Sequence, residues 1–160
     1  MRVKNVKIFT LLALLMAKLI LNTDCIEDNF FSGVRLLGIM SQLKNYRFCW
    51  LVNAYLSYDF RLNPDIEIQL KKKNRNYFFQ VYQFCEPECE MEHFIYNNQF
   101  EGEYLLPEFK HFDFLWLIKA DIIPEETFTS IQQNLKTING VQLVTELLQE
   151  KIKHKENLIL

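Results

Sequence analysis

The chain has 160 residues, a formal net charge of −2 and 49% hydrophobic residues, 14% of the total being aromatic. These values exclude a disordered chain and predict one domain with a sizeable core. The mild negative charge argues against nucleic-acid binding, which depends on neutralising phosphates. Four glycines leave little material for phosphate-binding loops, and the GxGxxG, GxxxxGKS/T, HExxH and GxSxG patterns are all missing.

The first 17 residues can be interpreted in two ways. The stretch "MRVKNVK" is basic and "IFTLLALLMA" is apolar, as in a signal peptide, but no A-x-A cleavage site follows. The run is also too short for a stable membrane span, which needs about 20 apolar residues, and Lys18 interrupts it. A start at Met16 is the alternative. We therefore expect residues 1–17 to be an extension, signal-like or from a mis-assigned start, and residues 18–160 to be one domain.

The first half of that domain predicts strands around one helix. Residues 42–57 have helix length, and their apolar side chains cover most of the circumference, which indicates packing on more than one side. Ser41 is positioned to cap this helix with its hydroxyl group. "LNPD" indicates a turn and "KKKNRN" a hairpin tip. The predicted strands are residues 18–24, 33–41, 65–70, 77–85 and 90–98.

The second half predicts further strands and a second helix. A short strand is expected to end at Pro107, and residues 112–120 are the most hydrophobic strand and should be central. Pro124 suits the first turn of a helix that Gly140 ends, before a strand at 141–148. The prediction is an α+β fold with a single antiparallel or mixed sheet of about six to seven strands, and two helices packed on one face.

One set of polar residues is a candidate binding site: Tyr46, Arg47, Asn53, Glu108 and Asp113. Tyr46 and Asn53 lie about 20° apart on the predicted helix. Arg47 lies in an otherwise apolar helix and needs a partner if buried, so we expect it to pair with Asp113 or Glu108. If this pairing is structural, it holds the helix against the sheet. If it is functional, the five residues form the base of a binding site for an anion or a peptide.

The cysteines indicate no catalytic group and no cofactor. Cys85, Cys89 and His93 are spaced four apart, but the spacing departs from common zinc motifs, so they are only weak metal candidates. A Cys85–Cys89 disulfide is an alternative if the protein is exported, and two reduced surface cysteines are favoured. Cys49 is expected to be a small buried hydrophobic residue.

Three stretches together resemble one family. "GIMSQLKNYRFCWLVN" is similar to a GIxS…DYRLCWxLN segment, "YLLPEFKHFDF" to the pattern I-P-E-x-x-x-V-D-Y, and "KIKHKENLIL" to KLKSKENLIF. The chain thus resembles the IPExxxVDY family of Bacteroidetes from about Lys18 to Leu160. Leu106, Phe112 and Phe114 stand where that pattern has Ile, Val and Tyr. The resemblance implies an intracellular protein that begins near the first strand. It implies a fold but no particular enzymatic activity.

The sequence favours a non-catalytic protein-interaction or accessory module in the cytoplasm. No complete acid–base, nucleophile, phosphate or metal motif is visible, and the expected ligand is a protein partner or a second copy. No nucleic acid and no stable membrane span are expected. Two alternatives stay open: a small-ligand-binding protein or enzyme that uses the polar cluster, and an exported protein with an N-terminal signal.

Overall fold

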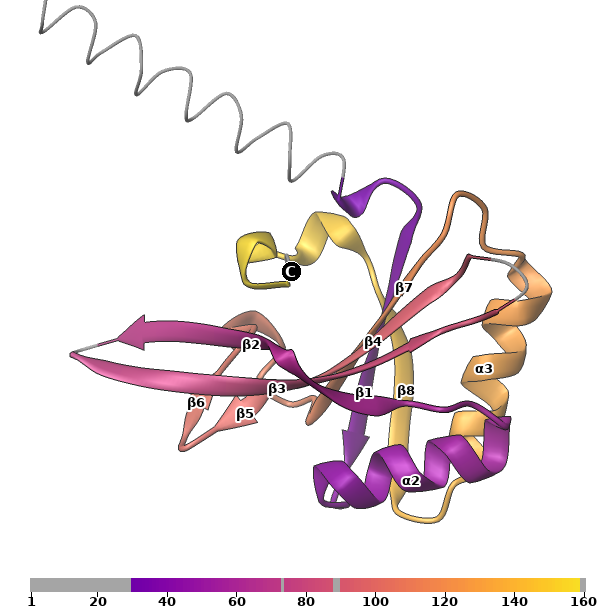
Figure 1. Ribbon diagram of the computed structural model, residues 1–160, viewed down its shortest axis with the longest axis horizontal. Helices are drawn as coiled ribbons and strands as arrows, with labels where there is room; N and C mark the ends of the chain where they lie inside the picture. The colour runs from indigo at the N-terminus through magenta and orange to yellow at the C-terminus, as the bar shows by residue number, and fades with distance from the viewer. Residues whose placement is uncertain (1–29, 73, 88–89, 159–160) are drawn as a thin grey trace, which may run out of the picture. The chain divides into compact units, whose positions relative to one another are not determined.

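The computed structural model describes residues 30–72, 74–87 and 90–158 (Figure 1). The chain divides into two units, Met1–Ser32 and Gly33–Leu160. The expected extension at 1–17, the alternative start at Met16 and the predicted strand at 18–24 lie outside the described residues. All strands and helices named below belong to the second unit.

The second unit contains an antiparallel sheet of six strands, in the order β2-β3-β4-β7-β1-β8. Two helices and a small two-stranded sheet, β5-β6, complete the α+β fold, as predicted. The elements are β1 Val34–Ser41, α2 Asn45–Leu56, β2 Arg61–Lys72, β3 Arg75–Cys85, β4 Glu92–Asn97, β5 Gln99–Phe100, β6 Glu103–Tyr104, β7 Phe114–Lys119, α3 Glu125–Thr137 and β8 Val141–Leu147. Short 3₁₀ turns occupy Pro107–Phe109 (η1), Gln149–Lys151 (η2) and Lys155–Leu158 (η3).

Both helices pack on one face of the sheet, as predicted (Figure 1). Phe48 and Val52 of α2 and Phe128 of α3 share a core with residues of β1, β4 and β7. The Phe48 ring stacks on Phe114 of β7 with centroids 4.3 Å apart. The strand β7 pairs with both β1 and β4 and is buried on both faces, which explains its continuous apolar run and confirms its predicted central place.

The opposite face is covered by the segment after β4 and by the C-terminal residues. Phe112 packs against Gly38, where an added Cβ would come within 2.8 Å of the Phe112 ring. The hydroxyl of buried Tyr96 donates to the carbonyl of Leu158. Leu105, Leu106, Ile152 and Leu158 are buried along with them. The sheet therefore lies between two apolar layers, and only the layer on one side is helical.

Two local predictions are wrong for identifiable reasons. Ser41 does not cap α2, because α2 begins only at Asn45, after Lys44, without a side-chain cap; the Ser41 hydroxyl donates to the carbonyl of Gly140 and accepts the N–H of Leu43. The "LNPD" stretch does not end a strand either. It lies inside β2 as an irregularity between Leu62 and Glu67, because Pro64 has no N–H to contribute to the ladder.

Asn98 connects the two ends of the segment that leaves β4 and returns as β7. Its side chain is fully buried. The Nδ2 group donates to the carbonyls of Phe109 and Phe112 at 3.0 and 2.9 Å, and Oδ1 accepts the N–H of Leu106 at 2.9 Å. Its own N–H donates to the carbonyl of Asp113. One side chain thus bonds three backbone groups, and two of them, the N–H of Leu106 and the carbonyl of Phe112, would otherwise be left unpaired; the carbonyl of Phe109 also accepts the N–H of Phe112.

We expect Asn98→Ala to lower the free energy of unfolding by at least about 2 kcal/mol, because two buried backbone groups lose their partner and each costs about 1–3 kcal/mol. Urea unfolding followed by circular dichroism measures this change. The neighbouring Asn97→Ala is the matched control, since Asn97 makes one exposed hydrogen bond, to the carbonyl of Gln99. Equal effects of the two variants would contradict the role of Asn98.

Candidate functional site

The helix α2 buries one side and exposes large aromatic residues on the other. Phe48, Cys49 and Val52 lie in the core. Tyr46 and Trp50, one turn apart, are each 65% exposed. The helix contacts both the sheet core and α3, so the predicted packing on more than one side is seen only in part. Apolar residues do occur all around the helix, but some of them, such as Tyr46 and Trp50, face solvent.

Arg47 lies on the exposed side of α2, next to these aromatic rings. At 100° per residue, Tyr46, Trp50 and Arg47 span about 100° of the helix circumference. We call these three residues the aromatic–arginine face. Among the described residues no ion pair involves Arg47, so its predicted pairing with Asp113 or Glu108 is wrong. The reason is exposure, because a solvated guanidinium group needs no buried partner.

The other three residues of the predicted cluster have separate partners. Asn53 pairs with both backbone groups of Phe60, donating to its carbonyl at 3.0 Å and accepting its N–H at 2.8 Å. The Asp113 carboxylate accepts the N–H of Ser41 at 2.7 Å. Each contact joins two segments of the chain. The five predicted residues therefore do not form one hydrogen-bonded site.

Glu108 holds the C-terminal segment against the fold. Its carboxylate accepts the N–H groups of Lys153 and His154 at 2.6 and 3.1 Å and contacts His154 Nδ1 at 2.9 Å. Burial alone would raise the pKa of Glu108, but its backbone hydrogen bonds and the contact with His154 outweigh burial and lower it. The charged form of Glu108 is therefore the form that stabilises the fold.

His93 does not have a ring nitrogen free for a metal. It is fully buried, Trp116 Nε1 donates to its Nδ1 at 3.2 Å, and Nε2 lies 3.0 Å from a Glu86 carboxylate oxygen. Burial lowers the pKa of His93 despite the neighbouring carboxylate. Cys85 is exposed, and Cys89 lies outside the described residues, as does any bond between these cysteines. Cys49 is buried as expected, and burial raises the pKa of its thiol.

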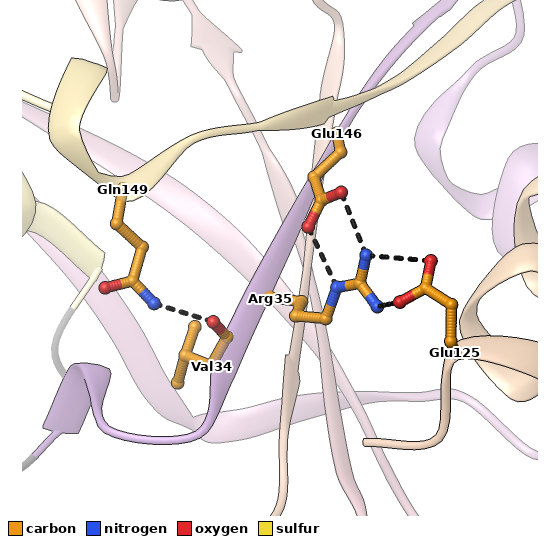
Figure 2. Close-up of polar contacts among 5 residues, drawn as sticks. All are labelled: Val34, Arg35, Glu125, Glu146 and Gln149. Atoms are coloured by element: carbon orange, nitrogen blue, oxygen red, sulfur yellow. Dashed lines mark hydrogen bonds and ion pairs between the residues drawn. The ribbon is translucent and has the colours of Figure 1, made fainter. Parts of the chain in front are cut away.

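Arg35 forms a second charged cluster, which the sequence analysis did not find (Figure 2). Its guanidinium group bonds Glu146 of β8 at 2.8 Å and Glu125 in the first turn of α3 at 2.6 Å, and it lies 3.4 Å from the centroid of the Phe128 ring. The hydrogen bond to Glu146 raises the pKa of Arg35 further. The two carboxylates accept from the guanidinium N–H groups that an anionic ligand would need. The cluster connects β1, β8 and α3.

A shallow pocket of about 510 Å³ lies beside the irregular part of β2 and the end of β3. Its polar side chains are already engaged with one another. Arg61 bonds Asp59 at 2.7 Å, and Asn63 donates to the Gln83 side chain at 2.8 Å. Cys85 borders the pocket. Among the described residues that line it, no convergent set of unpaired polar groups is seen, whereas small-molecule sites usually have one.

Comparison with known proteins identified no matching family model, curated protein or solved structure. Among the described residues, no helix has the length and apolar character needed to cross a lipid bilayer.

We expect Glu108→Gln to lower the free energy of unfolding by about 1–3 kcal/mol at pH 7, the usual contribution of hydrogen bonds to a charged group. The pKa of Glu108 is lower in the folded protein than its ordinary value of 4.5. The stabilisation is therefore present above that value and is lost as the pH falls through the folded pKa. Urea unfolding at pH 7, 5 and 3 should show the difference from wild type shrinking at pH 3.

Glu150→Gln is the control, because Glu150 is exposed and has no ion pair among the described residues. A Glu108→Gln effect that is the same at every pH would contradict the role of the charge.

Proposed function

We propose that this protein is a non-catalytic protein-interaction module of the cell interior, and that the aromatic–arginine face of α2 is its binding surface. The observation that carries the proposal is the exposure of Tyr46 and Trp50 beside Arg47. Tryptophan, tyrosine and arginine are the residues most enriched at energetic hot spots of protein interfaces. Exposing two large rings next to each other has a hydration cost that binding would recover.

The charge of this face indicates the chemistry of the partner. Arg47 is the only charged residue in α2, and Lys44 precedes the helix. No acidic side chain of α2 offsets them. A partner that offers apolar groups together with a carboxylate would cover the rings and pair with Arg47. Nucleic acid is not favoured, because the whole chain has a net charge of −2.

The arrangement of the polar residues supports binding over catalysis. Asn53, Glu108 and Asp113 each hydrogen-bond backbone groups and thereby connect parts of the fold. An enzyme or small-ligand site at the predicted polar cluster would need these groups to converge on one place. The export alternative depends on residues 1–17, which lie outside the described residues.

We also propose membership of the IPExxxVDY family, on the motifs quoted above. The residues of those motifs contact one another in the fold. Phe112 packs on Gly38, Asp113 binds Ser41, and Glu108 binds the backbone of the C-terminal segment. The motif residues would then be conserved parts of a scaffold, and the aromatic–arginine face would be the part that acts on other proteins.

The proposal predicts that Trp50→Ala and Arg47→Glu each remove the same partner without unfolding the protein. We expect affinity purification of the tagged full chain from its native cell to recover a protein that both variants lose. With that protein purified, each variant should weaken binding at least tenfold. Binding should also shift the emission of exposed Trp50 to shorter wavelength, while buried Trp116 changes little.

Ile122→Ala is the matched control, because Ile122 is an exposed apolar residue outside α2. Thermal unfolding of all variants should stay close to wild type. If the same proteins are recovered with Trp50→Ala, Arg47→Glu and Ile122→Ala, the aromatic–arginine face is not the binding surface.

A further inference from the structure

The strand β2 lies at one edge of the six-stranded sheet, and within the described part of the chain β3 is its only strand partner (Figure 1). On an edge strand, alternate residues direct their N–H and C=O groups away from the sheet. From Glu67 to Lys72 the pairing with β3 is regular. This half of β2 therefore offers a straight set of backbone groups to another strand.

A groove runs along this edge. It has a volume of about 450 Å³ and is lined by all six residues from Asp65 to Leu70, with Glu156 and Asn157 on one side. Successive residues of a strand face opposite sides of the sheet, so a groove that touches six in a row follows the strand edge. The groove therefore follows the edge of β2, with η3 on one side of it.

The charges on β2 are arranged in a self-complementary order. Asp65 and Glu67 lie at one end of the segment and Lys71 at the other, and all three side chains are exposed. Glu67 and Lys71 point to the same face, since Glu67 pairs with Gln80 and Lys71 with Asn76. None of the three has an ion pair among the described residues. Ile66, Ile68 and Leu70 are half-buried on the opposite face.

We propose that two copies of this chain associate through antiparallel pairing of their β2 strands. With Gln69 on the twofold axis, Glu67 of each copy lies opposite Lys71 of the other, and Ile68 lies opposite Leu70. Both pairs occur twice, as an interface between identical surfaces requires. Opposite charges directly across two strands stabilise the pairing, and like charges oppose it. The two sheets would then form one continuous sheet.

The ordinary interpretation of charges on an edge strand is protection against aggregation. Protection of that kind is strongest when the charges have one sign, because two identical edges then repel each other. On β2 the signs differ between the two ends, so antiparallel pairing brings opposite charges together. Because the contact is only a few residues long, we expect dissociation in the micromolar range. It uses a different surface from α2, so it does not depend on the proposed function.

The test exchanges the two charges in the full chain and measures mass by sedimentation equilibrium. We expect wild type to dimerise in the micromolar range, and Glu67→Lys and Lys71→Glu each to weaken dimerisation at least tenfold. The double variant Glu67→Lys/Lys71→Glu restores the pairs and should dimerise like wild type. An equimolar mixture of the two single variants should form a heterodimer, because one then carries two acidic and the other two basic residues.

Two control variants test whether a loss of dimerisation is specific to the β2 interface. Lys136→Glu makes the same charge change on exposed Lys136 of α3 and should leave the dimer unchanged. Trp50→Ala should also leave it unchanged. A wild-type monomer at about 1 mM would overturn the proposal, as would a dimer that is insensitive to the single exchanges. Loss of the dimer in Trp50→Ala alone would also overturn it, and would assign the second copy to the α2 surface.

Discussion

The buried amide of Asn98 is the constraint on which much of the remaining structure depends. It bonds three backbone groups of the segment between β4 and β7, and two of them, the N–H of Leu106 and the carbonyl of Phe112, have no other partner among the described residues. This segment carries Glu108, Phe112 and Asp113 to their contacts. A short polar side chain can meet such a need because a primary amide both donates and accepts. The second apolar layer over the sheet follows from this arrangement.

The polar residues of the fold mostly connect one segment to another. Glu108 binds the C-terminal segment, Asp113 binds the end of β1, and Arg35 joins β1 to β8 and α3. Among the described residues, these side chains therefore bond the fold itself. What the described residues present to other molecules is apolar or self-complementary: the aromatic–arginine face of α2 and the edge of β2. Both features are typical of proteins that bind proteins.

Much of the fold could be predicted because the relevant signals are local. Alternation identifies Ile66, Ile68 and Leu70 as a strand, and a continuous apolar run identifies β7 as buried on both faces. The polar cluster could not be predicted in the same way. Arg47 was expected to be buried because its helix is apolar all round, and the pattern does not say which apolar residues face solvent. Arg35 was missed, although a charge inside "VRLLGI" is a signal for a paired residue.

The sequence by itself determined the fold class, the two helices on one face and the central place of β7, because periodicity and hydrophobicity act between near neighbours along the chain. Only the tertiary structure decided where the polar side chains would find partners. Glu108 and Arg35 each bond residues that are distant in sequence, 45 positions away for Glu108 and Lys153 and 111 for Arg35 and Glu146. Such pairings depend on the path of the whole backbone. For the same reason, only the tertiary structure decides that Trp50 is exposed and Trp116 is buried.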